Sequence, residues 1–462
     1  GAFTALGGDL STMSQNPAGL GIYRSSEIGA TLDIDVQSSK TNSDGYSLKD
    51  NQTKAACNNF GYVGSVNIGS DVMPYFSWGV SYGRVASFDR VYRGGGMLGG
   101  SLSNYIANFT NGTNQGDLIF SKNRNPYYDT NSDWLSILAY NAYMVNPVGN
   151  NTTYQGLWDG ASSGDAMFTT RESGYVDEYN IDFGGNIMNT LYWGLGFGIT
   201  DISYRQDSYY DEMIDNAQVE TYDNGALTRG TAEYALSNWK RTTGNGFNFK
   251  VGLIFKPINE LRLGIAVHTP TYYSLQTSYN GTIDYEYKNA AGQVQHSSYR
   301  GGSDYTSETP YAYYDWSMHS PWKLMVGAAG VIGSSAIVSL DYERQAYNDM
   351  SAKDGDGYSL PYVNSDIKDT YQATNIIRLG LELRPTSNFS LRCGFNYETT
   401  DATDGAYNGT QPVYTSGTNP AYTLTDNTYR ITAGMGYRYH GFYADLAYVY
   451  SNRKSKWHGF SS

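Results

Sequence analysis

The dominant pattern along this chain is an alternation of bulky apolar residues with polar or small ones. It is clearest at 191–199, where a leucine, a tryptophan or another large apolar residue fills every second position and the positions between them are mostly glycine. The same pattern recurs at 247–255, 261–267 and 377–383. A period of two predicts β-strands with one apolar face. That face carries no charge, which is typical of a lipid-facing surface rather than of a soluble sandwich.

The alternating runs combine into hairpins that are joined by short turns. The predicted hairpins are 59–68 with 74–86, 177–188 with 190–204, 247–256 with 259–268, 322–332 with 335–346, 375–384 with 387–397, and 428–438 with 441–451. Long polar segments are predicted as loops between them: 38–58, 87–176, 205–246, 269–321, 347–374 and 398–427. Short turns at one end and long loops at the other are typical of bacterial outer-membrane barrels, with the short turns in the periplasm.

The predicted strands add up to an odd number. The run 27–37 adds a thirteenth strand to the hairpins, whereas single-chain bacterial barrels have an even number. We therefore expect the chain to continue past Ser462 with one more strand, which gives an all-β transmembrane antiparallel barrel of about fourteen strands. A weak strand overlooked within 271–287 remains the alternative.

Composition excludes several other classes of protein. Charged residues make up 16% and aromatic residues 15% of the chain, with 45 Tyr and 53 Gly. The mean hydropathy is −0.49, and no run approaches the ~18 apolar residues of a membrane-spanning helix. The aromatic content argues against disorder, and a net charge of −13 argues against nucleic-acid binding. Cys57 and Cys393 are expected to be unpaired.

A short motif precedes the first strand. Gly7–Gly8–Asp9 and Ser11–Thr12–Met13 lead into Asn16–Pro17–Ala18–Gly19–Leu20. The residue before proline is driven into an extended conformation, and the Asn16 amide can both donate and accept hydrogen bonds. Asn16 is therefore the predicted anchor of a compact segment inside the barrel. An ordinary turn leading into the first strand is the alternative interpretation.

This segment resembles the N-terminal part of the FadL/TodX family of outer-membrane transporters for hydrophobic compounds, in a Bacteroidetes-like form. The resemblance implies a plug, or hatch, at 1–26, formed around Asn16, Pro17, Ala18, Gly19 and Leu20, inside a barrel of fourteen strands that occupies 27–462. It also implies that the cargo leaves sideways through a kink in the third strand. In this sequence Gly79 and Gly83 are the candidates for that lateral gate, because glycine in a strand often marks a bend.

The region 87–176 is too long for a passive connection. Helical spacing of apolar residues appears at 101–110 and 132–144, and Ser132 and Asp133 are suited to cap the second helix. Two such helices over the barrel mouth would form an apolar groove for a hydrophobic ligand; in the resembling family, extracellular loops make the first ligand site. The candidate ligand-binding residues are Leu102, Tyr105, Ile106, Phe109, Trp134, Leu135 and Leu138. The alternative, which can coexist with a groove, is that these residues pack on one another to hold the loop shut.

No motif indicates catalysis or a cofactor. Gly94–Gly95–Gly96 lacks the Lys-Ser/Thr of a phosphate loop, and Asp354–Gly355–Asp356–Gly357 lacks the closing Glu of a calcium loop. The five histidines show no paired metal spacing, and no nucleophile elbow is present. We therefore predict no enzyme activity, no metal and no cofactor.

The sequence hypothesis is passive uptake of hydrophobic small molecules, such as long-chain fatty acids or aromatic compounds, across the outer membrane of a Gram-negative bacterium. The expected partners are the ligand, outer-membrane lipid and lipopolysaccharide. The alternative function is a barrel subunit or scaffold of a secretion or protein-assembly complex, bound to other outer-membrane or periplasmic proteins. A transporter predicts a continuous apolar cavity, and a scaffold predicts a filled lumen.

Overall fold

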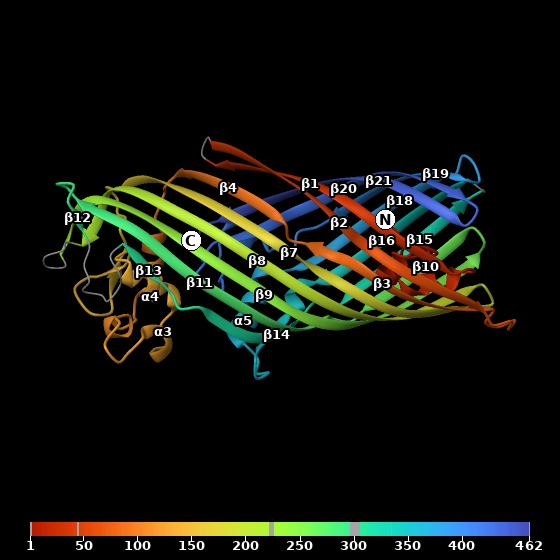
Figure 1. Ribbon diagram of the computed structural model, residues 1–462, viewed down its shortest axis with the longest axis horizontal. Helices are drawn as coiled ribbons and strands as arrows, with labels where there is room; N and C mark the ends of the chain where they lie inside the picture. Colours follow the sequence, from red (N-terminus) through yellow and green to blue (C-terminus); the bar gives the residue numbers. More distant parts are fainter. Residues whose placement is uncertain (1, 44–45, 221–225, 296–304, 334, 462) are drawn as a thin grey trace.

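The computed structural model describes residues 2–43, 46–220, 226–295, 305–333 and 335–461. These residues form a long, strongly curled sheet (Figure 1). Helices and the ends of long strands gather at one end of the sheet, and short turns lie at the other end. The N-terminal segment lies inside the curl, near the end with the short turns.

The strands that form the wall pair antiparallel with their neighbours in chain order, as the predicted hairpins require. The wall consists of β1 (Glu27–Ser43), β2 (Tyr46–Asn67), β3 (Tyr75–Ser87), β7 (Ser163–Ile187), β8 (Leu191–Glu220), β9 (Leu227–Ile258), β10 (Leu261–His268), β15 (Lys323–Ile332), β16 (Ala336–Ala346), β18 (Ala373–Leu383), β19 (Phe389–Glu398), β20 (Tyr422–Tyr439) and β21 (Phe442–His458). In the described part of the chain, β1 and β21 share no ladder. A further strand between them stays a prediction.

Several segments predicted as loops are strands instead. Residues 38–43 continue β1 and residues 46–58 belong to β2, whereas most of 205–246 extends β8 and β9, which run for 30 and 32 residues. The prediction of loops there was wrong because the outward positions of these extensions are mostly polar or charged, as at Asp211 and Glu233, so the pattern of a lipid-facing strand is missing. Their inward residues, such as Ile214, pack against residues of the 87–176 region instead. Their many threonines and tyrosines still favour extended structure.

The segment 269–321 also contains strands, β11 (Tyr272–Asn289), β12 (Val294–Gln295), β13 (Thr306–Glu308) and β14 (Ala312–His319). β11 pairs with β9 beyond the end of β10. The weak strand that was the alternative within 271–287 therefore exists, but it lengthens the wall next to β9 rather than adding a strand beside β10.

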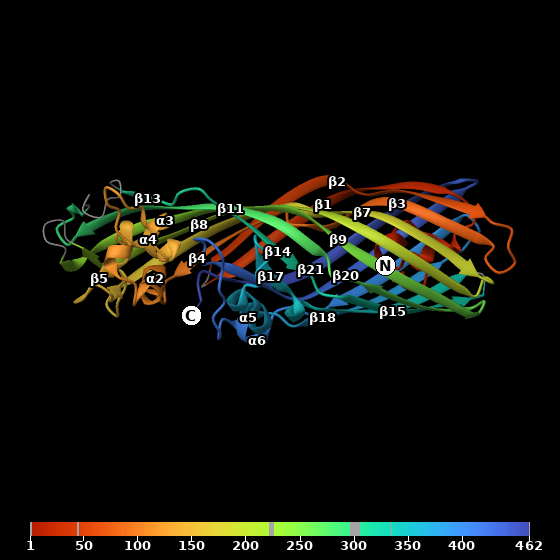
Figure 2. The same cartoon turned by 90° about the horizontal axis from the view of Figure 1, so that it is seen from below.

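The elements of the 87–176 region lie toward the end opposite the short turns, whereas the helices between residues 361 and 408 lie nearer the middle of the wall (Figure 2). The region 87–176 contains β4 (Arg90–Met97), α2 (Leu102–Thr110), η2 (Gln115–Asp117), α3 (Pro126–Asp129), α4 (Trp134–Asn141), β5 (Asn146–Pro147) and β6 (Tyr154–Gln155). Further along the chain are η4 (Tyr347–Asp349), β17 (Ser351–Asp354), α5 (Pro361–Thr370) and α6 (Asp404–Asn408). Both predicted helices of the 87–176 region are present. Ser101 caps α2 and Asp133 caps α4, where its Oδ1 accepts from Leu135 N at 2.8 Å.

The wall is apolar outside and polar inside. On β8, Leu195 points outward and is 50% exposed, whereas its inward neighbours are buried. Inward positions on the neighbouring strands carry charged residues that are almost fully buried, such as Asp182 and Lys250. Exposed apolar and buried charged residues invert the usual arrangement of a soluble protein, and they are the pattern of a barrel that faces lipid.

Two further sequence expectations concern cysteines and helices. Cys57 in β2 and Cys393 in β19 are both free and exposed, as predicted. Among the described residues, no helix has the length and apolar character needed to span a membrane.

Candidate functional site

The hatch, residues 1–26, is described from residue 2 onward and is built from two short helical turns. These are α1 (Thr12–Gln15) and the 3₁₀ helix η1 (Pro17–Ile22), and Asn16 lies between them. Asn16 is extended, with φ −134° and ψ 102°, as expected for a residue before proline. The turn at Asn16 lets both helical pieces fold against the wall.

Asn16 ties three segments together. It is fully buried, and its Nδ2 donates to Thr4 O at 2.6 Å and, at 3.4 Å each, to the carbonyl oxygens of Leu253 and Ile265. Its Oδ1 accepts from Ala18 N at 3.1 Å. The amide therefore both donates and accepts, and it joins the hatch to the backbone of β9 and β10. Its role as the hatch anchor remains a proposal.

Side chains of the wall also hold the hatch backbone. Asp341 on β16 accepts from Thr4 N at 2.9 Å. Nε2 of His268 on β10 lies 2.8 Å from Gln15 O. Sequence reasoning missed both anchors. The available signal was a polar residue at the inward position of an alternating strand, but the pattern does not say what such a residue contacts.

Glycines make the space in which the hatch is seated. Gly184, Gly194 and Gly252 lie directly opposite one another on β7, β8 and β9. A Cβ at Gly194 would lie 2.1 Å from the carbonyl carbon of Pro17, and a Cβ at Gly252 would lie 1.8 Å from Asn16 Oδ1. A side chain at either position would displace the hatch.

The predicted lateral-gate glycines are part of a regular strand. Gly79 and Gly83 both continue the ladder between β2 and β3. A Cβ at Gly79 would lie 2.5 Å from Met13 Sδ, so this glycine makes room for the hatch. The register of β3 against β7 shifts between Arg84 and Ala86 instead. The expected irregularity is thus displaced toward the loop end, and a gate at Gly79 and Gly83 stays a prediction.

The predicted ligand residues of the 87–176 region divide into two sets. The first set is buried in one core with residues of β8, β9 and β11, and consists of Leu102, Ile106, Leu135 and Leu138. The second set keeps part of its surface exposed, and consists of Tyr105, Phe109 and Trp134. The first set therefore packs as the alternative interpretation expected, and the second set keeps part of its aromatic surface accessible; ligand binding by either set stays a prediction.

A buried carboxylate fixes α2 on the wall. Glu212 on β8 accepts from Leu102 N at 2.8 Å, from Ser101 Oγ at 2.6 Å and from the Tyr210 hydroxyl at 2.7 Å. Burial raises the pKa of the Glu212 carboxyl, while these donors act in the opposite direction. Because its contacts run to the start of α2, Glu212 determines how the loop core sits on the strands.

A polar cavity of about 290 Å³ lies between β4, β7, β8, β9 and the ends of β20 and β21. Within it Arg90 is ion-paired with Glu172, which also accepts from the Tyr204 hydroxyl at 2.9 Å. Lys240 Nζ donates to Ser416 Oγ at 3.0 Å, and burial lowers the pKa of Lys240. This cavity is lined mainly by polar and charged groups, so it is not the apolar cavity that the uptake hypothesis expects.

Comparisons with known proteins give similarity to solved structures alone. The toluene transporter TodX of Pseudomonas putida is 13% identical, covering 97% of this chain and 89% of that chain, with a TM-score of 0.44. A FadL homologue of Pseudomonas aeruginosa is 14% identical, and the match covers 98% of this chain and 88% of that chain, with a TM-score of 0.47. The monoaromatic hydrocarbon channel CymD is 12% identical, covering 98% and 90%, with a TM-score of 0.43. The chain is similar to proteins of the type that its N-terminal motif resembles. No family model and no curated protein matches the chain.

Proposed function

We propose that this protein is an outer-membrane β-barrel that takes up hydrophobic small molecules, such as long-chain fatty acids or aromatic compounds, down their concentration gradient. The observation that carries the proposal is a wall with an apolar exterior that encloses a separately folded hatch. The hatch is held by a small number of hydrogen bonds, among them those of Asn16 and Asp341. A plug held in this way can shift without unfolding the barrel.

The proposed path has three stages. A ligand first meets the exposed ring of Phe109 and the partly exposed rings of Tyr105 and Trp134 at the loop end. It then enters the barrel, and it leaves when the hatch around 16–20 shifts. Hydrophobic compounds need such a protein because the polysaccharide layer of lipopolysaccharide obstructs them. No energy source is required, since transport follows the gradient.

Growth of Gram-negative cells that lack their own channel for long-chain fatty acids tests the proposal. Cells producing this protein should grow on oleate as the sole carbon source, whereas cells with the empty vector should not. Both strains should grow equally on a water-soluble carbon source, which is the control for general fitness. Equal growth of the two strains on oleate and on an aromatic hydrocarbon would refute the uptake function.

The alternative role as a barrel subunit of a secretion or assembly complex predicts a different result. Native mass spectrometry of the detergent-extracted protein should then show a bound protein and no bound hydrophobic compound. A bound small molecule that solvent extraction identifies as a fatty acid or an aromatic compound favours uptake.

A further inference from the structure

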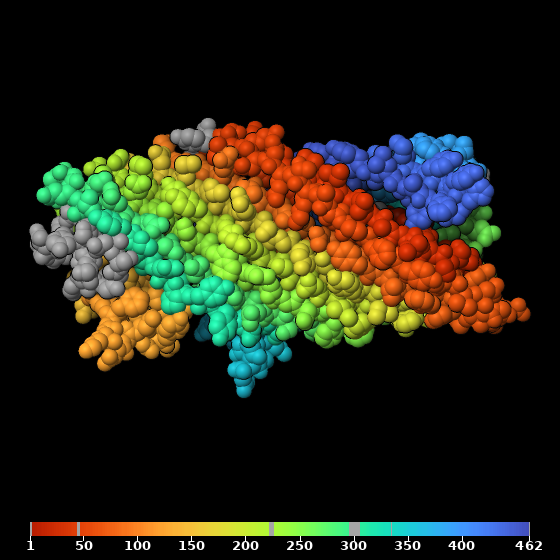
Figure 3. Space-filling view, in the orientation of Figure 1, coloured from red at the N-terminus to blue at the C-terminus, as the bar shows by residue number. Residues whose placement is uncertain are grey.

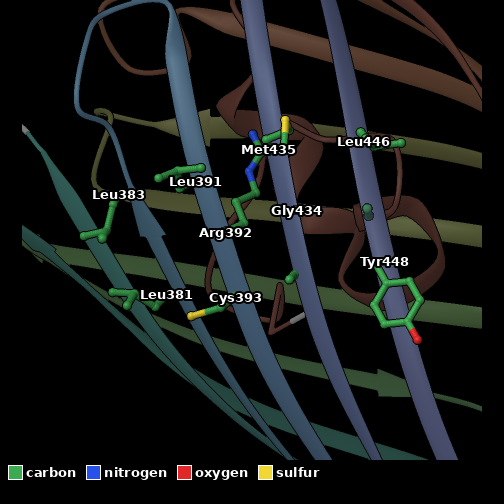
Figure 4. Close-up of a pocket in the computed structure, with 11 residues that line it drawn as sticks. Leu381, Leu383, Leu391, Arg392, Cys393, Gly434, Met435, Leu446 and Tyr448 are labelled. Atoms are coloured by element: carbon green, nitrogen blue, oxygen red, sulfur yellow. The ribbon is translucent and has the colours of Figure 1, made fainter.

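The outer face of the wall has a hollow on β18, β19, β20 and β21, in a cavity of about 610 Å³ (Figure 4). At its centre, Cys393 and Ala433 are directly paired across β19 and β20. Leu381 on β18 and Tyr448 on β21 are their neighbours in the same cross-strand row. Two small side chains between two large ones leave a depression, here called the dent.

Rows of large side chains border the dent on both sides. Toward the short turns the row runs Leu383, Leu391, Met435 and Leu446. Toward the loop end the row runs Leu379, Phe395, Ile431 and Tyr450. All these residues share the outward face of the wall, so the dent is surrounded by apolar side chains.

The dent offers no charge to an occupant. Arg392 contributes to its lining, but Arg392 Nε donates to Glu382 Oε2 at 2.8 Å and Nη1 donates to Asp445 Oδ1 at 2.7 Å. The guanidinium is therefore neutralised by carboxylates on neighbouring strands. A hydrocarbon chain is the chemistry that such a surface accepts, because burying a polar group there would leave it without a partner.

The position along the strands indicates the membrane leaflet. Tyr437, Tyr439 and Phe442 lie exposed beside the β20–β21 turn, as an aromatic girdle does at the membrane–water interface. Ala433 lies four residues from Tyr437, which corresponds to about 13 Å along a strand. For a strand tilted by ~45°, this places the dent roughly 9 Å deeper in the membrane than the girdle. Because the short turns are the periplasmic side of such barrels, the dent lies in the periplasmic leaflet.

We propose that the dent binds an acyl chain of a phospholipid from the periplasmic leaflet, as a lipid site on the outside of the wall and separate from the uptake path. This inference rests on the proposed placement of the chain in an outer membrane. The phospholipid headgroup would lie at the level of the girdle, and its chain would fill the space above Cys393 and Ala433. A larger side chain at Ala433 should fill that space and prevent the lipid from binding.

The test compares the parent with Ala433→Leu, which fills the dent. Ala328→Leu is the matched control, since Ala328 lies on β15 in an outward position between Leu263 and Leu340, and β16 and β18 separate it from Cys393 on β19. Each protein is refolded in phosphatidylethanolamine bilayers, extracted in detergent and delipidated stepwise, and bound lipid is counted by native mass spectrometry. We expect the parent and Ala328→Leu to retain one phospholipid, and Ala433→Leu to retain it at least fivefold less.

A phosphatidylethanolamine that carries a photoreactive diazirine on its acyl chain shows where on the wall the lipid binds. Photo-crosslinks should fall on peptides of β19 and β20 in the parent and be lost in Ala433→Leu. Equal lipid retention by Ala433→Leu, or crosslinks from a free diazirine fatty acid but not from the phospholipid, would overturn the lipid site and leave the uptake proposal standing. The parent protein should also insert into bilayers as a folded barrel, which migrates differently on a gel before and after heating. If its migration does not depend on heating, the outer-membrane placement and the lipid site are both overturned.

Discussion

Replacing Gly252 by alanine places a methyl group where the hatch is seated. An ideal Cβ at this position would lie 1.8 Å from Asn16 Oδ1. Because non-bonded carbon and oxygen atoms do not come closer than about 3 Å, the Asn16 side chain must move by roughly 1 Å. Gly252 lies in continuous ladders with β8 and β10, so the wall is the stiffer partner and the hatch is the part that moves.

The size of the effect follows from the bonds that such a movement breaks. Asn16 Nδ2 lies 2.6 Å from Thr4 O and Asn16 Oδ1 lies 3.1 Å from Ala18 N, and a shift of about 1 Å takes both pairs out of hydrogen-bonding range. At about 1 kcal/mol for each bond, the seated hatch loses about 2 kcal/mol. This corresponds to a change of roughly 30-fold in the equilibrium between seated and displaced hatch.

Ion conductance in planar bilayers measures that equilibrium. The parent should be nearly closed, and Gly252→Ala should spend about 30 times more of its time open. Gly330→Ala in β15 is the matched control, because a Cβ there would have no described atom within 4 Å. The reasoning fails if Gly252→Ala migrates as a folded barrel on an unheated gel and yet stays as closed as its parent.

Three further predictions address the hatch, the lipid face and the loop core. Deletion of residues 1–19 should leave a barrel that refolds, because the strands satisfy one another's hydrogen bonds, but one that conducts ions continuously; a folded and closed deletion variant would contradict gating by the hatch. Leu195→Arg should destabilise the barrel in lipid by about 2–4 kcal/mol, measured by urea unfolding in vesicles, and an unchanged midpoint would mean that the faces are reversed. Glu212→Ala should leave the buried Leu102 N–H without its acceptor, at a cost of about 1–3 kcal/mol, whereas Ser101 Oγ keeps the hydroxyls of Ser103 and Tyr234 as partners. Hydrogen exchange in 102–110 should then rise while the barrel strands stay protected, and unchanged exchange would exclude Glu212 as the support of α2.

The regular part of the wall was predictable from the sequence alone. Alternation at 191–199 and 247–255 identifies both the strands and their outward face, because a strand turns successive side chains to opposite sides. The short turns between such runs also set the order of the strands, so that segments close in sequence lie side by side as bands of similar colour on the face in Figure 3. The motif at 16–20 predicted the extended conformation at Asn16, because the residue before proline is restricted locally. That this segment forms a hatch was implied by its resemblance to a known family.

The strand extensions and the loop core were decided by the tertiary structure. Residues 205–220 and 226–246 lack the lipid-facing pattern because their outward positions are mostly polar or charged, as at Asp211 and Glu233. Pairing along the neighbouring strand extends them, and a single segment does not encode that pairing. The helices at 101–110 and 132–144 show their periodicity in sequence, but not whether their apolar side lines a groove or a core. Packing against β8, β9 and β11 buried Leu102 and Leu138.

The seating of the hatch depended most on the tertiary structure. Asp341 and Thr4 are 337 residues apart in the chain, and Gly184, Gly194 and Gly252 become one surface only when three strands lie in register. An inward polar residue or a strand glycine has the same local signature whether it faces water, a ligand or another part of the chain. Local periodicity therefore determined which side of each strand faces the lumen, and only closure of the sheet decided what each inward residue touches, because those contacts join segments whose separation no local pattern records.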